Sequence, residues 1–465
     1  MNPYEVARTI VTYLDALKDA PPHRPYPREL REELAAQPIP ADGRPFGDVL
    51  AEFREKIAPY PFGNGHPRFL AWVNSPPHPA GIAADALAAA MNPSVAGGDH
   101  AAVHIEHQVV RWFADAAGFP AGSGGLLVSG GSTATLTALA VARHRAAARA
   151  GIDVRAAGLQ GDARFAVYVG EEGHGSARKA VELLGLGSAW VRTVAVGGDF
   201  RMDPDHLRTL IAADRARGVH PVAVVASAGT TNTGAIDPLD EIADVCAELD
   251  VWLHVDGAYG LPALLFLDEY AHHRPGLSRV DSIAMDPHKW LYAPIDAGLV
   301  LLRDPALARD AFSLVPAYLR TDDEPWFSEF GFEQTRPFRA LKIWFLLHHL
   351  GTRGYADLIR HDLAMADRLA AAVEADEDLE LLARGLSVVC FRGRPAGVRL
   401  DELDAQNRRV LADVQRDAFL AGTTVNGVFG LRACVVNPGT TAADIDAVLE
   451  LVRSAVRRGP AGPPA

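Results

Sequence analysis

Residues 282–294 of the chain read SIAMDPHKWLYAP, and they put a lysine just beyond a short apolar run. A lysine on a surface loop is usually only a solvated charge. Lys289 instead stands between a histidine and a tryptophan, directly after a run with the length and composition of a buried strand. Its position at the end of a strand makes Lys289 a candidate functional residue.

Similar apolar runs alternate with helical stretches through the middle of the chain. They are LLVS, FAVYV, VAVVAS, VWLHVD and GLVLLRD, between residues 126 and 304. Short apolar runs separated by helices favour a mostly parallel sheet that is covered by helices on both faces. The sequence therefore predicts an α/β fold.

The flanking regions have other patterns. Residues 1–65 are predicted to form a helical arm around a proline-rich connector, residues 66–350 a large domain, and residues 351–457 a small α+β domain. We expect a long helix from about Phe338 to Leu350, strands at LSVVCFR and GLRACVV, and a last helix near Ala442–Val456. The tail, residues 458–465, is rich in glycine and proline and is expected to be disordered.

Composition excludes several classes of protein. The formal net charge is −13 over 465 residues, which argues against a nucleic-acid partner. The sequence contains neither a signal-peptide pattern nor an apolar window long enough to span a membrane. Cys246, Cys390 and Cys434 are widely spaced, as expected for reduced thiols in a cytoplasmic protein.

Four polar features fall at the predicted strand ends, where parallel sheets bind ligands. They are the turn SGGST at 129–133, His174 in EEGHGS, Asp256 in HVDGAYG, and Lys289. Each has an ordinary structural explanation, such as a helix cap or a turn. Together they predict a pyridoxal phosphate site, with an anion-binding turn, a lysine for the Schiff base, an acid for the pyridine nitrogen and an imidazole against the ring.

The chain also resembles the fold-type I, group II pyridoxal-phosphate-dependent amino-acid decarboxylases, whose familiar member is aromatic-L-amino-acid decarboxylase. The matching stretches run in family order from about residue 60 to 350: HPRFLAW, GGLLVSGGSTATLTALAVAR, EEGHGSARKA, SAGTTNTGAIDPL, WLHVDGAYG, DPHKWLYAP and RPFRALKIWF. The resemblance implies the fold-type I transferase fold, a homodimer with shared active sites, and an N-terminal arm that wraps around the partner.

The resemblance also implies roles for individual residues. The cofactor-binding set comprises Gly130, Gly131, Ser132, His174, Thr230 or Thr231, Asp256, Ala258, His288 and Lys289. Trp72 and Val73, with the stretch near Ser94 to His100, match the region that shapes the substrate pocket. Tyr318 matches a loop tyrosine that protonates the substrate's Cα and helps to exclude water.

The expected activity is decarboxylation of an L-amino acid to its amine through a Lys289 Schiff base and a quinonoid that Tyr318 protonates. A second hypothesis has the same cofactor but another outcome. Either O₂ reacts with the quinonoid and gives an aldehyde, or another Cα or Cβ lyase reaction takes place. A third reading is a non-catalytic scaffold, against which the intact set of Lys289, Asp256 and His174 argues.

Some residues depart from the family pattern or suggest another ligand. Asp286 stands where aromatic decarboxylases usually have asparagine, the segment TDDEPWFSEFGFEQT at 321–335 is short and aromatic, and Val73 and Ser94 replace larger rings. The spacing of His100, His104 and His107 would put them on one face of a helix, which suggests a zinc site as an alternative. Without an HExxH motif, no metal is expected, and polar pocket lining is favoured.

Overall fold

The computed structural model describes residues 3–314 and 325–458. The chain divides into two compact units, Pro77–Arg360 and a second unit that combines Met1–Pro76 with His361–Ala465. Each unit has its own sheet. Within the described ranges, no helix combines the length and the apolar character that crossing a membrane requires.

The larger unit is built on a seven-stranded sheet in the order β1-β7-β6-β5-β4-β2-β3. Its strands are β1 (Gly124–Val128), β2 (Arg164–Gly170), β3 (Val191–Val194), β4 (Val219–Ser227), β5 (Trp252–Asp256), β6 (Ser282–Met285) and β7 (Gly298–Leu302). Only β7 runs antiparallel to its neighbours, β1 and β6. The predicted, mostly parallel sheet is confirmed.

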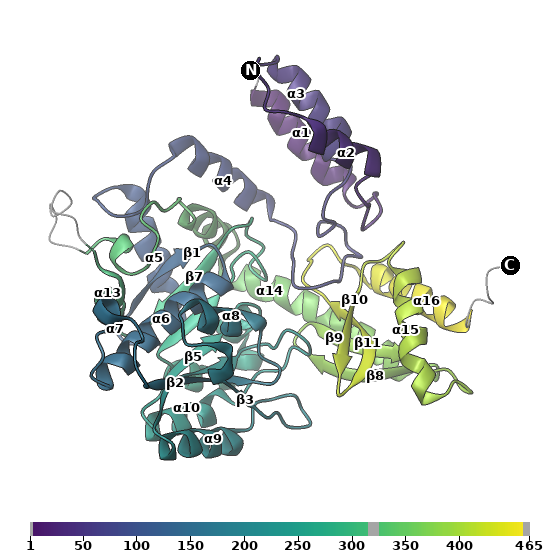
Figure 1. Cartoon of the computed structure of the whole chain (residues 1–465). Coiled ribbons are helices and arrows are strands. Elements are labelled where there is room, and N and C mark those ends of the chain that lie inside the picture. The colour runs from purple at the N-terminus through teal and green to yellow at the C-terminus, as the bar shows by residue number, and fades with distance from the viewer. Residues whose placement is uncertain (1–2, 315–324, 459–465) are drawn as a thin grey trace. The chain divides into compact units, whose positions relative to one another are not determined.

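Helices cover both faces of this sheet (Figure 1). The α-helices of the larger unit before the long helix α14 are α4 (Pro79–Met91), α5 (Ala101–Ala116), α6 (Gly131–Arg149), α7 (Val154–Ala157), α8 (Gly175–Leu183), α9 (Pro204–Ala216), α10 (Leu239–Glu248), α11 (Leu261–Phe266), α12 (Arg274–Leu277) and α13 (Pro305–Phe312). Short 3₁₀ turns are η2 (Ser188–Trp190), η3 (Asp268–His273) and η5 (Phe327–Glu329). Because parallel crossovers are right-handed, α6 and α8 lie on one face, while α9 and α10, which return toward the centre of the sheet, lie on the other.

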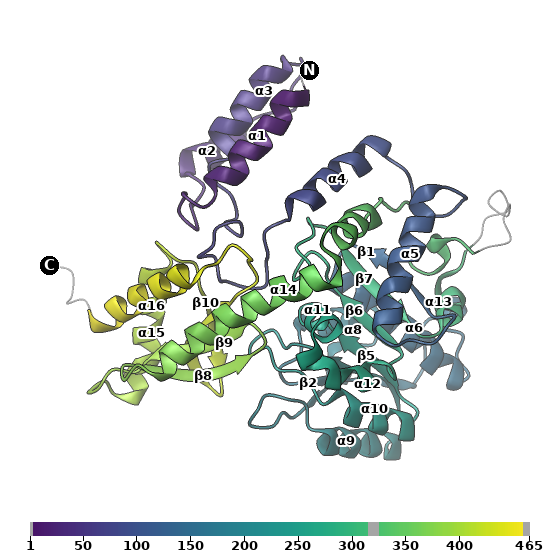
Figure 2. The same cartoon turned by 180° about the vertical axis from the view of Figure 1, so that it is seen from behind.

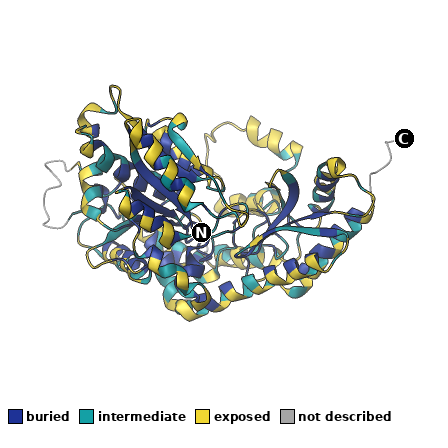
Figure 3. Cartoon of the chain, turned by 90° about the horizontal axis from the view of Figure 1, so that it is seen from below, coloured by how far each residue is buried: buried dark blue, intermediate teal, exposed yellow. Residues whose placement is uncertain are grey.

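The strand sequences explain why both faces are covered. All five residues of β7 are buried, and so are the last six of β4, VAVVAS. A strand that is apolar on both sides needs helices above and below it. Figure 3 shows these strands in the dark blue of buried residues, with the exposed residues concentrated on the helices.

The second unit contains a four-stranded antiparallel sheet in the order β10-β11-β9-β8. Its strands are β8 (Leu379–Gly385), β9 (Val388–Gly393), β10 (Ala421–Val425) and β11 (Val428–Cys434), and its helices are α1 (Pro3–Ala16), α2 (Arg28–Ala36), α3 (Phe46–Glu52), the π-helical turn η1 (Phe53–Ile57), α15 (Leu400–Val414) and α16 (Ala442–Arg457). Its core packs Phe391 and Leu431 from the sheet against Val410 of α15 and Val452 of α16.

The long helix α14 (Ala340–Glu374) differs from the prediction (Figure 2). Its first segment ends near Leu350, as expected, because Gly351 takes a non-helical conformation with φ 63°. A second helical segment then continues to Glu374, which the sequence pattern did not predict. The boundary between the two units falls within this second segment.

Candidate active site

The carboxyl ends of the central strands meet at one edge of the large sheet. Asp256 closes β5, where it is paired with Ser227 at the end of β4 and with Ala284 near the end of β6. Since β1 and β6 are both antiparallel to β7, β1 points the same way as β6. The turn that follows β1 therefore lies at the same edge as Asp256 and the lysine loop.

The glycine turn after β1 is pressed closely against that loop. A Cβ atom on Gly131 would lie 3.0 Å from Oδ2 of Asp286 and 3.1 Å from Cβ of Ala258. A Cβ on Gly130 would lie 3.3 Å from Cε1 of His288. Glycine is therefore required for this close approach, and helix α6 begins here with its N–H groups directed at the turn, an arrangement that suits a phosphate group.

Lys289 is held beside a buried acid. Its Nζ atom lies 2.9 Å from Oδ2 of Asp286, and its backbone N–H donates to the Asp286 carbonyl at 2.8 Å. The Lys289 side chain is 24% exposed and that of Asp286 only 4%. The adjacent His288 accepts the N–H of Ala297 through Nδ1, and burial lowers the pKa of its imidazole. Lys289 is thus a partly accessible amine in a confined polar setting.

Asp256 is half-buried and is held in place by its surroundings. Its Oδ1 accepts the N–H of Ala258 at 3.1 Å, and its carbonyl accepts the N–H of Ala228 at 2.9 Å. The neighbouring strand end is fixed by Asp237, whose Oδ2 accepts the N–H of Ser227 at 2.7 Å. Burial raises the pKa of Asp237 to about 6. Asp237 falls in the stretch SAGTTNTGAIDPL, where no residue pattern marks it as the anchor of a strand end.

The remaining predicted cofactor residues lie on strand-end loops of the same unit. His174 caps α8, and its Nδ1 lies 2.8 Å from the Ser176 hydroxyl while the ring stays exposed. Thr230 is buried, and its hydroxyl accepts the N–H of Ala235 within its own turn, whereas Thr231 is exposed. Ser132, the second residue of α6, is also exposed. Of the two threonines, Thr231 is the one whose side chain faces outward.

Comparison with known proteins identifies the family. The family model described as "Pyridoxal-dependent decarboxylase conserved domain" matches residues 27–394. The chain belongs to the pyridoxal-dependent decarboxylase family. It is 31% identical to an aromatic-L-amino-acid decarboxylase of Bacillus atrophaeus over 97% of this chain and 94% of that protein. It is 29% identical to a 4-hydroxyphenylacetaldehyde synthase of Rhodiola rosea over 91% and 86% of the two chains.

A solved structure agrees with this membership. The structure of Oryza sativa TDC with PLP and tryptamine superposes with a TM-score of 0.91 at 30% identity, covering 98% of this chain and 96% of the other. This decarboxylase family uses pyridoxal phosphate, and the protein is a carboxy-lyase of that family. The glycine turn, where a Cβ at Gly131 would crowd Asp286 and Ala258, and the amine of Lys289 fit the cofactor's phosphate and aldehyde.

Two predicted residues of this decarboxylase belong to the other unit, and a third is not described by the structure. Trp72 and Val73 belong to the second unit. Trp72 is 46% exposed and stacks on Phe62, with ring centroids 5.2 Å apart. Tyr318 lies outside the described residues.

The three histidines do not share one helical face, so that expectation was wrong. His100 precedes α5 with extended backbone angles, which leaves only His104 and His107 on the helix. His104 lies 2.7 Å from Asp99, and His107 stacks on Phe327 with centroids 4.3 Å apart. Across residues 3–314 and 325–458, no cluster of three or more histidine, cysteine or acidic side chains is arranged to hold a metal.

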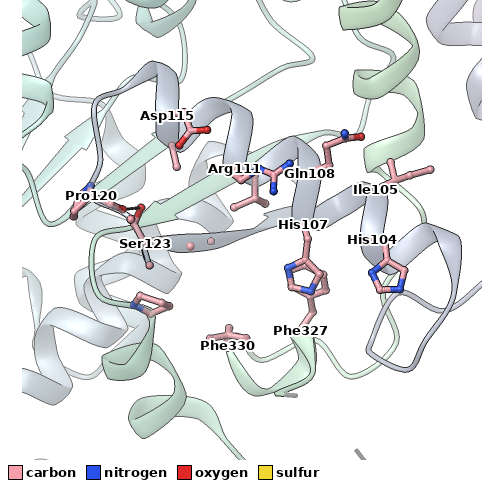
Figure 4. Close-up of a pocket in the computed structure, with 17 residues that line it drawn as sticks. His104, Ile105, His107, Gln108, Arg111, Asp115, Pro120, Ser123, Phe327 and Phe330 are labelled. Atoms are coloured by element: carbon pink, nitrogen blue, oxygen red, sulfur yellow. Dashed lines mark hydrogen bonds between the residues drawn. The ribbon is translucent and has the colours of Figure 1, made fainter. Parts of the chain in front are cut away.

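The two α5 histidines instead line a pocket of about 790 Å³ (Figure 4). Arg111, Phe327 and Phe330 also border it, and Gly124 and Gly125 of β1 form part of its wall. These glycines begin β1, whereas the glycine turn beside Lys289 follows its end. The pocket therefore lies at the other end of β1 from the glycine turn and does not contain the lysine site.

The aromatic segment after Pro325 is anchored on α5. Phe327 is buried, and the Cζ atom of Arg336 lies over its ring, 4.9 Å from the ring centroid. Arg336 forms an ion pair with Glu106 of α5, and both side chains are fully buried. The Ser328 N–H donates to the Ala96 carbonyl at 3.0 Å. Phe327 thus has a packing role, which accounts for one of the aromatic residues of this segment.

Proposed function

We propose that this carboxy-lyase converts an L-amino acid, with an aromatic one as the leading candidate, to the corresponding amine. The observation that carries the proposal is the amine of Lys289, which lies beside the glycine turn after β1 at the sheet edge where Asp256 ends β5. The names of the Bacillus atrophaeus and Oryza sativa relatives support the aromatic substrate class.

In this proposal each residue has a defined task. Lys289 binds the cofactor's aldehyde, and Gly130, Gly131 and Ser132 bind its phosphate. Asp256 keeps the pyridine nitrogen protonated, with His174 against one ring face and Ala258 leaving room at the other. Thr230 or Thr231 contacts the side of the ring that carries the 3-hydroxyl, and the exposure of Thr231 favours it. His288 packs against Gly130 and shapes the turn.

Pyridoxal phosphate, when bound, accepts the electrons of the Cα–carboxylate bond as CO₂ leaves. The protein must then deliver a proton to Cα, and we assign that step to Tyr318. Trp72 and Val73 are assigned to the substrate pocket. Val73 is a small residue for a contact to an aromatic substrate.

The second candidate is oxidative decarboxylation to an aldehyde, which the similarity to the Rhodiola rosea aldehyde synthase favours. The two reactions differ in their co-products. Incubation with a panel of L-amino acids, with CO₂, amine, aldehyde and H₂O₂ measured together, separates them. Amine in equal amount to CO₂, without H₂O₂, supports the simple decarboxylase, and aldehyde with H₂O₂ overturns it.

We also propose that the protein is a homodimer whose active sites draw on both subunits, with residues 1–65 as an arm on the partner. Several apolar residues of the arm are exposed in the single chain: Tyr4, Val11, Leu34, Ile39 and Phe46. A second subunit would cover such a surface. Sedimentation that finds an active monomer contradicts this assembly.

The division into an arm, a cofactor domain at 66–350 and a small domain at 351–457 remains part of the proposal, and residues 459–465 of the predicted tail lie outside the described residues. A cytoplasmic location is proposed too. Cys246, Cys390 and Cys434 are buried thiols, which agrees with a reducing compartment.

A further inference from the structure

Asp286 occupies an unusual position for a charged side chain. Asp286 is only 3% exposed. Its Oδ2 atom lies 2.9 Å from Nζ of Lys289 and 3.7 Å from Nε2 of His288. Its other oxygen, Oδ1, is buried and has no hydrogen-bond partner. A buried carboxylate oxygen without a partner is costly, so this atom calls for an explanation.

The carboxyl group of Asp286 is directed at the glycine turn. A Cβ on Gly130 would lie 3.6 Å from Oδ1 of Asp286, and a Cβ on Gly131 would lie 3.0 Å from its Oδ2. This turn is the part of the site that the proposed function gives to the cofactor's phosphate. Bound phosphate and Asp286 would then be close neighbours at the start of α6.

Two ionised groups of this kind are incompatible. A phosphate monoester carries about −1.5 to −2 charges at pH 7, and both its oxygens and those of a carboxylate only accept hydrogen bonds. Binding also removes the compensating ammonium, because Nζ of Lys289 forms a C=N bond to the aldehyde carbon. The aldehyde oxygen leaves as water with two of the ammonium protons, and the third is released to solvent, which leaves a neutral nitrogen.

We propose that Asp286 takes up a proton when the cofactor binds and, as a neutral acid, donates it to a phosphate oxygen. The inference rests on the proposed phosphate site. It explains the unpartnered Oδ1, because this oxygen gains a partner only when an anion enters the turn. Asp286 thereby makes loading of the cofactor depend on pH.

The neighbouring groups determine the sign of this dependence. In the free protein, Lys289 and His288 face Asp286, while Gly130, Gly131 and the methyl group of Ala258 bring no charge to it. The bound phosphate favours the neutral acid, because a second negative charge beside it is unfavourable. One proton is therefore bound with the cofactor, so the affinity for the cofactor falls by up to about tenfold per pH unit as the pH rises.

The test measures protons and affinity rather than turnover. Apoprotein is titrated with pyridoxal 5′-phosphate by calorimetry at pH 7 to 8.5, in two buffers that differ in ionisation enthalpy. The variants are Asp286→Asn, Asp286→Ser and the control Asp268→Asn, whose side chain is 94% exposed. Protons released by Lys289 or carried by the phosphate are common to all and cancel in the difference.

Wild type and Asp268→Asn should take up as much as one proton more per cofactor than either Asp286 variant. Asp286→Asn should bind more tightly than wild type at pH 8, by a factor that grows with pH. With pyridoxal, which lacks the phosphate, the difference should vanish. Equal proton counts, a difference that persists with pyridoxal, or weaker binding by Asp286→Asn at pH 8 overturns the inference. A protein that behaves as expected here but makes no amine contradicts the proposed function alone.

Discussion

The Nε2 atom of His254 lies 3.3 Å from Oγ1 of Thr135, which connects β5 to helix α6. The other ring nitrogen, Nδ1, lies 2.9 Å from the Ser282 hydroxyl of β6. His254 and Asp256 are two residues apart on one strand and therefore point to the same face. Thr135 lies one turn after the start of α6 at Gly131. His254 thus connects β5, which ends in Asp256, to α6, which starts at the glycine turn.

Because His254 is fully buried, its environment should make the stability of the protein fall in mild acid. Burial lowers the pKa of His254 to about 4, from 6.5 for an ordinary histidine. Below pH 6.5 the unfolded chain takes up a proton that the folded chain refuses, so stability present above pH 6.5 is lost as the pH falls toward 4. At pH 5 the loss is about 2 kcal/mol. The free energy of urea unfolding is measured against pH for wild type, His254→Gln and the exposed-site control His220→Gln. Only His254→Gln should weaken the pH dependence of this free energy. An unchanged pH dependence in His254→Gln contradicts the prediction.

Lys289→Ala should abolish turnover without unfolding the protein, because the Lys289 side chain is partly exposed at the edge of the sheet. CO₂ release and the near-visible absorbance of bound cofactor should both be lost, while the far-ultraviolet circular dichroism spectrum stays unchanged. Lys179→Ala, on the exposed surface of α8, is the matched control and should behave as wild type. A Lys289→Ala protein with a rate near that of wild type would exclude Lys289 as the cofactor-binding lysine.

Asp256→Asn should lower the rate roughly 10³-fold, since a neutral amide cannot keep the pyridine nitrogen protonated. The affinity for pyridoxal phosphate should also fall, and the absorbance spectrum of the bound cofactor should change. Asp357→Asn removes a carboxylate that is 79% exposed on α14 and should change none of these. If spectrum and rate survive in Asp256→Asn, Asp256 serves only to hold the turn at Ala258.

Tyr318→Phe should shift the products rather than only slow the reaction. An unperturbed phenol has a pKa near 10, so at neutral pH it holds a proton that it can give to Cα. Without this proton donor, the carbanion-like species has more time to react with O₂. We expect less amine and proportionally more aldehyde and H₂O₂, measured against CO₂ in the same samples. A product ratio equal to that of wild type means that another group supplies the proton.

Much of the larger unit could be predicted from the sequence because its central strands are apolar on both faces. The missed strand β3 reads VRTV, and its arginine and threonine hide the pattern of a buried strand. In the second unit β8 and β10 were missed for a similar reason, since LELLARG and AGTTV are only partly buried. The second segment of α14 was missed because Gly351 reads as the end of a helix.

The candidate site was predictable where residue types carry chemistry, as at Lys289 and Asp256. The contacts that support it were not. The pairing of Glu106 with Arg336 has no sequence signature, because Arg336 lies 230 residues away and no sequence period connects the two residues. Asp237 likewise fixes Ser227 and Met202 through backbone N–H groups, which have no sequence signature.

Glu329 holds the chain on both sides of residues 315–324. Its Oε2 atom accepts the Ser313 hydroxyl at 2.7 Å and the Arg309 guanidinium at 2.8 Å, while its Oε1 accepts the Trp326 N–H. The segment that carries Tyr318 is therefore inserted between two fixed points. Doubling the length of such an insertion costs only about 0.6 kcal/mol in closure entropy. Exchanging residues 315–324 for the corresponding segment of a relative should therefore leave the glycine turn, the lysine and the sheet as they are and, on the role proposed for Tyr318, change the products.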